Sequence, residues 1–135
     1  MSHTCSTAII RCMDFRLGGA IRDYLDSNDL YNDVDIISIA GASKDLVEDA
    51  DGFLATQIEL SKSLHNIDRI ILMNHTDCGG YGGRSAFESP EDEIENHVTD
   101  MKIAKSKLNE KYPDIEVELA LAHIDDNNEV SITHV

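Results

Sequence analysis

Two short segments carry the side chains best suited to chemistry. Cys12, Asp14 and Arg16 follow one apolar, β-branched run, and His75 and Cys78 follow another. Two thiolates and one imidazole suit Zn²⁺ and leave a fourth position for water, a substrate or one carboxylate. Because neighbouring parallel strands end at the same edge of a sheet, we expect Cys12 to meet His75 and Cys78 there. The pattern indicates metal-assisted chemistry.

An acid and a permanent cation stand beside the first expected ligand. Asp14 can accept a hydrogen bond from metal-bound hydroxide, or it can coordinate the metal itself. Arg16 can hold Asp14 in the first of these roles through a bidentate pair that a lysine does not match. Away from a metal, the two would form a solvated ion pair worth less than ~1 kcal/mol. Asp77, between the other two ligands, is expected either to orient a ligand or to cap the following turn.

Other reactive residues have less support. Cys5 lies in a polar stretch without a partner nearby in the sequence and is expected to be incidental. The glycine-rich loop at 79–83 has neither the P-loop lysine nor the Gly-x-Gly-x-x-Gly spacing, which argues against a nucleotide cofactor. Solvated helix positions or sheet faces are expected for the remaining histidines that follow the first strand: His65, His97, His123 and His134.

Composition narrows the classes of partner. The 135 residues include 26 acidic and 11 basic ones, a formal net charge of −15. Such a field repels nucleic acid and anionic membranes. Three cysteines without a signal-peptide pattern at residues 1–7 indicate reduced thiols rather than a disulfide framework. No apolar run is long enough to cross a bilayer, so a cytoplasmic protein is expected.

The elements that position these residues alternate between strands and helices. Such alternation predicts a single α/β domain over residues 1–135, with a central, mostly parallel β-sheet flanked by helices. Ser43 is expected to cap one helix, and Gly52 marks a break or kink within it. Strands are expected at 6–12, 34–40, 68–74, 117–124 and 130–135, and helices at 17–27, 44–65 and from Ser89 to before Pro113.

The paired motifs resemble the zinc-site signature of the β-carbonic anhydrases. Cys12-x-Asp14-x-Arg16 is followed some sixty residues later by His75-x-x-Cys78-Gly79, and the order of strands and helices around them matches as well. The resemblance covers most of the chain. Arg11 to Asp14 and Asn74 to Gly79 are its closest stretches.

This resemblance implies a zinc ion held by Cys12, His75 and Cys78, with Asp14 and Arg16 as the catalytic dyad. It implies reversible hydration of carbon dioxide to bicarbonate and a proton by a metal-bound hydroxide. The backbone amides of Gly41 and Gly79 are expected to help hold the bicarbonate. The family also implies a homodimer, or a multiple of dimers, with the active sites near the subunit interface.

Two alternatives follow from departures from the family pattern. Ser38 to Gly41 keeps only the last two residues of the usual Arg-Asn-Ala-Gly, and only eleven residues precede Cys12, where relatives commonly carry a helical arm. One alternative is a catalytically silent zinc-binding or partner-binding module, with Asp14 on the metal. The other keeps the site but hydrolyses carbon disulfide or carbonyl sulfide.

Overall fold

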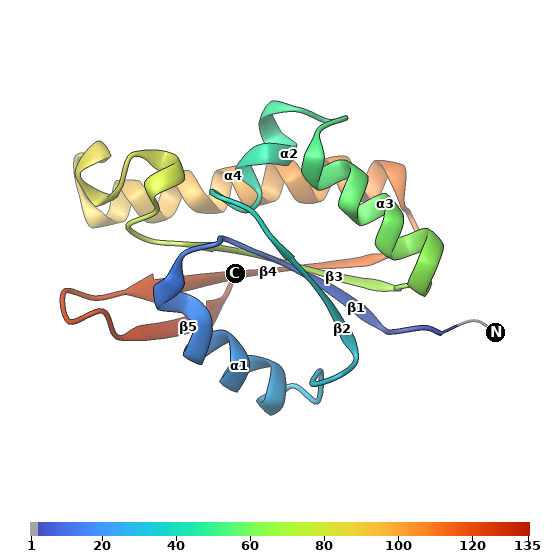
Figure 1. The fold of residues 1–135 in the computed structure, drawn as a ribbon. Coiled ribbons are helices and arrows are strands. Elements are labelled where there is room, and N and C mark those ends of the chain that lie inside the picture. The colour runs from blue at the N-terminus through green and yellow to red at the C-terminus, as the bar shows by residue number, and fades with distance from the viewer. Residues whose placement is uncertain (1–2) are drawn as a thin grey trace.

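The chain folds as one α/β domain around a five-stranded sheet, seen in a computed structural model that describes residues 3–135 (Figure 1). The sheet order is β2-β1-β3-β4-β5. The strands are β1 (Thr7–Arg11), β2 (Val34–Ser38), β3 (Arg69–His75), β4 (Glu116–Ile124) and β5 (Val130–His134). The helices are α1 (Gly18–Ser27), α2 (Lys44–Glu48), α3 (Phe53–His65) and α4 (Pro90–Lys111), with 3₁₀ turns at Phe15–Leu17, Gly79–Tyr81 and Arg84–Ala86. The predicted α/β class with a mostly parallel sheet is confirmed.

The register of the parallel strands brings the two motifs to one edge of the sheet. Strand β1 pairs in parallel with β2 and β3, and Arg11 lies opposite Met73. Strand β3 also pairs in parallel with β4, whereas β5 is antiparallel and closes the edge beyond it. The residues just after Arg11 and the last residues of β3 therefore emerge side by side.

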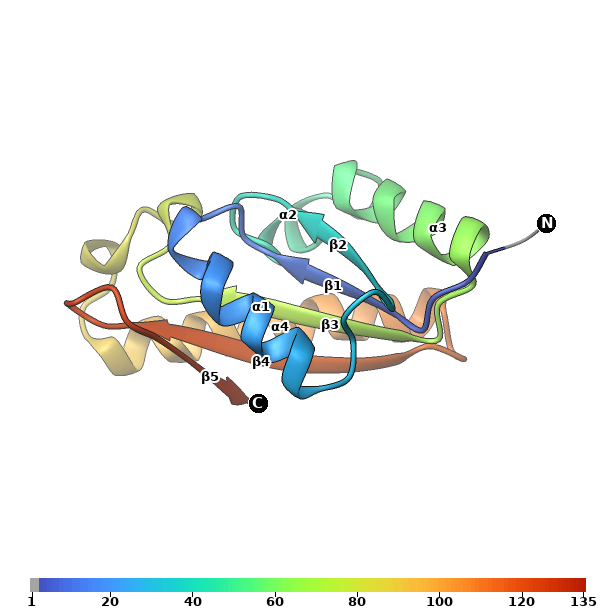
Figure 2. The ribbon, with the colours of Figure 1, turned by 60° about the horizontal axis from the view of Figure 1, so that its bottom comes forward.

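Helices cover the two faces of the sheet unequally. Helix α1 packs on one face, and α2, α3 and α4 cover the other, as the two views show (Figures 1 and 2). Both faces of the central strand are consequently buried. Ile70 and Leu72 point into the core beneath α3 and α4, and Ile71 and Met73 point into the core beneath α1. This explains the continuous apolar run of β3.

The helix expected over 44–65 is two helices. Helix α2 ends at Glu48, and Gly52, with an extended backbone, stands at the N-cap of α3, so the predicted break is confirmed. The prediction for Ser43 was wrong in its chemistry. Ser43 precedes α2 but makes no capping hydrogen bond, because its hydroxyl donates to the Asn74 side chain at 2.6 Å. Ser89 does cap α4, accepting from the Asp92 amide at 3.0 Å.

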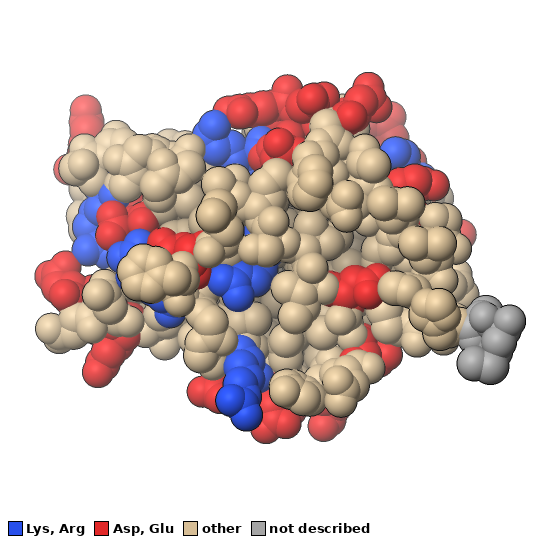
Figure 3. All heavy atoms as spheres, in the orientation of Figure 1, with Lys and Arg blue, Asp and Glu red and all other residues tan. Residues whose placement is uncertain are grey.

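The surface reflects the acidic composition. Acidic side chains gather along the top of the molecule in Figure 3, where α2 and the turn before α3 lie. Lys and Arg side chains are fewer and are scattered over the visible face. Across residues 3–135, no helix is both long and apolar enough to cross a membrane.

Candidate metal centre

Cys12, His75 and Cys78 converge at the carboxyl edge of the sheet, as the sequence predicts. Cys12 directly follows β1, His75 is the last residue of β3, and Cys78 lies in the loop after it. One donor atom from each residue lies within 4.8 Å of the other two, and all three residues are buried. The convergence follows from the parallel pairing of β1 and β3.

The spacing of these donors fits a tetrahedral metal ion. The Cys12 and Cys78 Sγ atoms lie 3.9 Å apart. Two sulfurs bound to one zinc ion at about 2.3 Å stand about 3.8 Å apart in a tetrahedron, so neither side chain needs to move far. Their contact is a thiol hydrogen bond in the metal-free chain, since both cysteines are free.

The imidazole of His75 contributes a ring nitrogen as the third metal-donor atom, beside the two sulfurs. Its Nδ1 donates to the carbonyl of Thr76 at 2.6 Å, which leaves the lone pair of the ring on Nε2. That Nε2 atom is buried and has no hydrogen-bond partner among residues 3–135. A buried polar atom without a partner is costly, and a metal ion would satisfy it. The residues present therefore fit a zinc ion.

The contact between the two thiols shifts their pKa values in opposite directions. The hydrogen bond with Cys78 lowers the pKa of Cys12, and backbone amides of Gly41 and Asp14 act in the same direction. The same contact with Cys12, together with burial, raises the pKa of Cys78. Cys12 is therefore the thiol that ionises more readily, and a cation at the site would favour ionisation of both.

Asp14 is held beside the donors by a bidentate pair with Arg16. The Arg16 Nη2 and Nε atoms donate to Asp14 Oδ2 at 2.8 Å and Oδ1 at 3.1 Å, and the Arg16 amide donates to Oδ1 at 2.9 Å. Hydrogen bonding to Arg16 lowers the pKa of Asp14 to about 2. Asp14 Oδ2, which accepts from Arg16, also lies 3.9 Å from His75 Nε2. Asp14 is therefore an ionised acceptor that faces the donor cluster.

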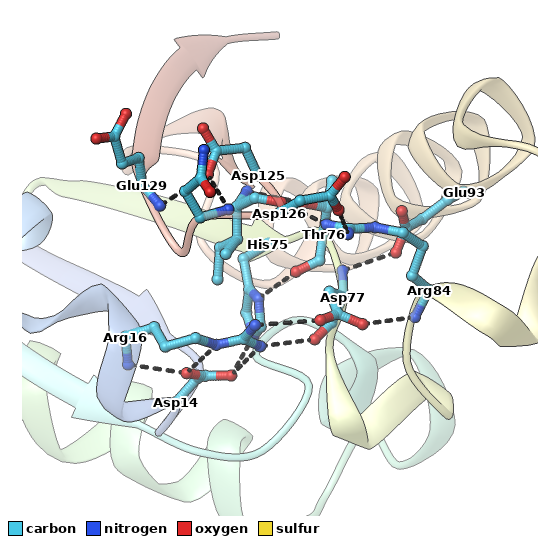
Figure 4. Close-up of polar contacts among 12 residues, drawn as sticks. Asp14, Arg16, His75, Thr76, Asp77, Arg84, Glu93, Asp125, Asp126 and Glu129 are labelled. Atoms are coloured by element: carbon cyan, nitrogen blue, oxygen red, sulfur yellow. Dashed lines mark hydrogen bonds and ion pairs between the residues drawn. The ribbon is translucent and has the colours of Figure 1, made fainter.

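Arg16 is fixed from its other side by Asp77. Its Nη1 donates to Asp77 Oδ2 at 3.1 Å, and Nη2 donates to the Asp77 carbonyl at 3.0 Å (Figure 4). The second oxygen of Asp77 accepts from the Arg84 amide at 2.8 Å and closes the glycine-rich loop. The expected cap on the turn directly after Asp77 is not observed, because the turn at Gly79–Tyr81 receives no side-chain capping hydrogen bond. The Asp77 carboxylate orients Arg16, and through it Asp14, rather than a sulfur or imidazole donor.

Two glycines let the loops after β2 and β3 meet over the site. Gly41 has a φ of +80°, a conformation that other residues adopt with strain. A Cβ on Gly80 would lie 2.9 Å from the Gly41 nitrogen. Gly41, one of the two expected substrate-binding positions, thus lies against the loop after β3, in which Gly79 directly follows the donor Cys78. Gly80 is what permits the close approach of the two loops.

His97 is buried behind the donors, so the expectation of a solvated position was wrong. It is inaccessible to solvent, on the face of α4 that packs on the sheet. Asn74 donates to His97 Nδ1 at 3.1 Å and to the Tyr81 hydroxyl at 3.1 Å, and accepts from Ser43. Tyr81 in turn donates to Asp100 at 2.7 Å. This network joins the loops around the candidate site to β3 and α4.

His97 makes stability depend on pH. Burial lowers the pKa of His97 to about 4. Below its ordinary pKa of about 6.5, the unfolded chain takes up the proton and the folded chain does not, so stability falls as the pH drops. We expect the free energy of unfolding to lose about 2 kcal/mol between pH 7 and pH 5 from this group alone.

Urea unfolding at the two pH values checks this expectation. A His97→Gln variant should show a loss smaller by about that amount, whereas His134→Gln, at an exposed position of β5, should behave as the parent. Identical pH dependence in the parent and in His97→Gln would contradict the assignment.

A separate pocket of about 530 Å³ lies between the start of α4 and the β4–β5 turn. Arg84 lines this pocket. It donates to Asp126 at 2.9 Å (Figure 4) and to the carbonyl of Ile124. Glu93, buried beside it, accepts from the Asp77 amide at 2.7 Å. The acidic lining disfavours an anionic ligand, and the contact between Glu93 and the Asp77 amide anchors the loop that carries Cys78.

The fold and the motif together define a carbonic anhydrase-like protein, and comparison with known families agrees. The family model described as "Putative carbonic anhydrase" matches residues 1–134, and the chain belongs to this family. Relatives include an uncharacterized protein of Rickettsia conorii, 30% identical over 130 residues that cover 91% of this chain and 70% of the relative. Another uncharacterized protein, from Rickettsia bellii, is 33% identical over 130 residues that cover 91% of this chain and 79% of the relative.

Solved structures of similar fold are β-carbonic anhydrases. Isoform I from Trichomonas vaginalis superimposes with a TM-score of 0.64 at 18% identity, covering 97% of this chain and 83% of that one. A tetrameric enzyme from Sordaria macrospora superimposes with a TM-score of 0.51 at 13% identity, covering 99% and 84%. At these identities the likeness shows the fold, and the chemistry is argued from the residues of this chain.

Proposed function

We propose that the protein catalyses the reversible hydration of carbon dioxide to bicarbonate and a proton, with zinc as its cofactor. One observation carries the proposal. The donors of Cys12, His75 and Cys78 converge with an unpartnered imidazole nitrogen, and an ionised Asp14 faces them. Family membership and the β-carbonic anhydrase fold support the same reaction.

Three residues would hold the cofactor, and a zinc ion bound by them would supply a Lewis acid that lowers the pKa of a water molecule from 15.7 to about 7. Thr76 keeps the ligand nitrogen of His75 unprotonated by accepting the proton of Nδ1. The buried surroundings of the two sulfurs exclude bulk water from the donors.

Asp14 orients the nucleophile. As an ionised acceptor it takes a hydrogen bond from the attacking water oxygen, which directs an oxygen lone pair at the carbon of CO₂. Both Asp14 oxygens accept from Arg16, and this pairing opposes coordination of Asp14 to the metal. The geometry thus favours a catalytic centre over a silent module in which Asp14 occupies the fourth position.

The substrate and the product differ in charge, so the electrostatic field of the protein acts on the product and not on the substrate. Carbon dioxide is neutral and is not repelled by a chain of net charge −15. Bicarbonate is an anion, which the backbone amides of Gly41 and Gly79 can hold briefly and which the acidic surface then repels. Fast release of product follows from this charge balance.

The test is proton release from CO₂ by stopped flow, using protein loaded with one equivalent of zinc. We expect catalysis that is lost when a chelator removes the metal and restored when zinc is added back. A folded, zinc-loaded sample that shows no rate above buffer from pH 6 to pH 9 would refute the proposal. Sulfide release from carbonyl sulfide without CO₂ hydration would identify the hydrolase alternative instead.

We propose further that the protein forms a homodimer, or a multiple of dimers, through the surface beside this site. Two large apolar side chains flank the candidate dyad: Met13 is 67% exposed and Phe15 is 88% exposed. Apolar residues so open to water mark surfaces that associate. The Sordaria macrospora neighbour is tetrameric, which supports an oligomer here.

A charged residue at Phe15 should break this association. Phe15→Asp would bury an unpaired carboxylate at the interface, so we expect the dissociation constant of the dimer to rise at least about 30-fold, as for a central interface aromatic. Light scattering across a concentration series measures it. Phe53→Asp, at a Phe that is 55% exposed on α3, is the matched control and should leave the dimer intact. Equal masses for the parent and Phe15→Asp would contradict this interface.

A further inference from the structure

We propose a second metal site, formed by Cys5, Asp35 and His65, that binds a divalent transition-metal ion such as zinc. One donor atom of each residue lies within 4.8 Å of the other two. The three come from the segment before β1, from β2 and from the last position of α3. A thiol, a carboxylate and an imidazole are all zinc ligands, so this cluster offers three donors.

The cluster lies at the opposite end of the sheet from the first site. Figures 1 and 2 place the start of β1 beside the end of α3, away from the edge where β1 and β3 end. Cys5 and Cys12 are separated by seven residues, or about 23 Å of extended chain. An ion bound at one site therefore makes no contact with the other.

Contacts already hold the donors together. His65 Nδ1 lies 2.7 Å from Asp35 Oδ2, which also accepts from the Ser61 hydroxyl at 2.6 Å. The Cys5 amide donates to the His65 carbonyl at 3.1 Å and fixes the start of the chain on the end of α3. His3 packs its ring against that of His65, with centroids 4.9 Å apart.

Tetrahedral zinc keeps such donors roughly 3.3 to 3.8 Å apart, given metal–ligand distances of about 2.0 to 2.3 Å. The Asp35–His65 pair would open by about half an ångström, and the Cys5 thiol would exchange its contact with the Thr7 carbonyl, 3.6 Å away, for the ion. The His65 and Asp35 side chains are each 27% exposed, and a pocket of about 270 Å³ borders both. The ion can therefore enter without unfolding of the chain.

A nucleophilic role for Cys5 fits the cluster less well. Burial and the charge of Asp35 raise the pKa of the Cys5 thiol, whereas an activated thiol requires the reverse. A carboxylate beside a thiol disfavours the thiolate, and a divalent cation between the two removes that repulsion. The arrangement suits a metal better than covalent catalysis.

Cobalt titration of the reduced, metal-free protein tests the second site. We expect two equivalents to bind, the second at least tenfold more weakly because its donors are partly exposed. Its charge-transfer band should have about half the intensity of the first, with one thiolate instead of two. The same titration on protein that already carries one equivalent of zinc isolates the second event. One equivalent in the parent protein would overturn the proposal.

Variants locate the ion. Cys5→Ser and His65→Gln should each abolish the second equivalent and leave the first unchanged, whereas Ser63→Ala, exposed on the last turn of α3, should retain both. Survival of the second equivalent in Cys5→Ser and His65→Gln would refute the site. The site would also be refuted if the second equivalent were lost in His3→Ala but survived in Cys5→Ser, because the ion would then depend on His3 and not on Cys5.

Discussion

Cys12→Ser abolishes stoichiometric zinc binding at the first site and lowers CO₂ hydration by at least about 1,000-fold. The buried Cys12 sulfur lies 3.9 Å from that of Cys78, and a serine hydroxyl cannot replace a thiolate ligand. Loss of the Lewis acid removes several kcal/mol of transition-state stabilisation, and each 1.4 kcal/mol is a factor of ten in rate. Metal content by mass spectrometry and stopped-flow rates on the same sample measure both effects.

A core substitution in the same strand separates metal loss from general damage. Ile9→Val shortens a fully buried side chain of β1 and costs about 1 kcal/mol of stability. It should keep its zinc and its rate, because Ile9 packs in the core beneath α1 and is not one of the three donors. Full activity in Cys12→Ser, or equal losses in both variants, would contradict the assignment of Cys12.

Asp14→Asn lowers kcat about 100-fold while zinc stays bound. The amide keeps the size of the side chain but loses the negative charge that pairs with both Arg16 nitrogens. The carboxylate that faces His75 is therefore replaced by a neutral group that accepts hydrogen bonds less strongly. Loss of a positioned proton acceptor costs about 10² to 10⁴ in rate. Because CO₂ is neutral and binds without this carboxylate, KM should change little.

The matched control is Asp126→Asn. Asp126 also accepts from an arginine, Arg84, at 2.9 Å, but its side chain is 96% exposed and lies away from the donors. This variant should retain the parent kcat. A loss of zinc in Asp14→Asn would mean that Asp14 is itself a ligand, and an unchanged kcat would show that it takes no part in the reaction.

The alternation of strands and helices and the first donor cluster could be predicted because both rest on strong local signals. Apolar, β-branched runs mark β1 and β3, and parallel strands bring their carboxyl ends together, which places Cys12 near His75. The break at Gly52 was visible because glycine interrupts a helical pattern. The roles of Cys12, His75 and Cys78 as ligands remain predictions that the experiments above address.

The missed residues depend on tertiary contacts. His97 follows Glu93 and precedes Met101 at intervals of four, a spacing that marks one helix face, but its polarity argued for solvent. Its burial depends on Asn74, a partner on another element. Gly80 is needed because the loop after β2 passes close to it, which no spacing in the sequence indicates.

The Cys5 cluster was missed for a different reason. The argument applied to the carboxyl ends of parallel strands applies equally to their amino ends, where the starts of β1 and β2 lie side by side. That edge also receives the end of α3, which brings His65 to Asp35. Sequence motifs draw attention to the first edge, because ligand sites usually lie there.

X-ray absorption at the zinc edge, on protein loaded with one equivalent, tests the central claim most directly. The account predicts two sulfur neighbours at about 2.3 Å and two lighter atoms at about 2.0 to 2.1 Å, one of them an imidazole nitrogen. A Cys78→Ser sample, which lacks the second sulfur donor, should retain no stoichiometric zinc, as expected for Cys12→Ser. A parent shell with one sulfur or none, or protein that retains no zinc after desalting, would contradict the account.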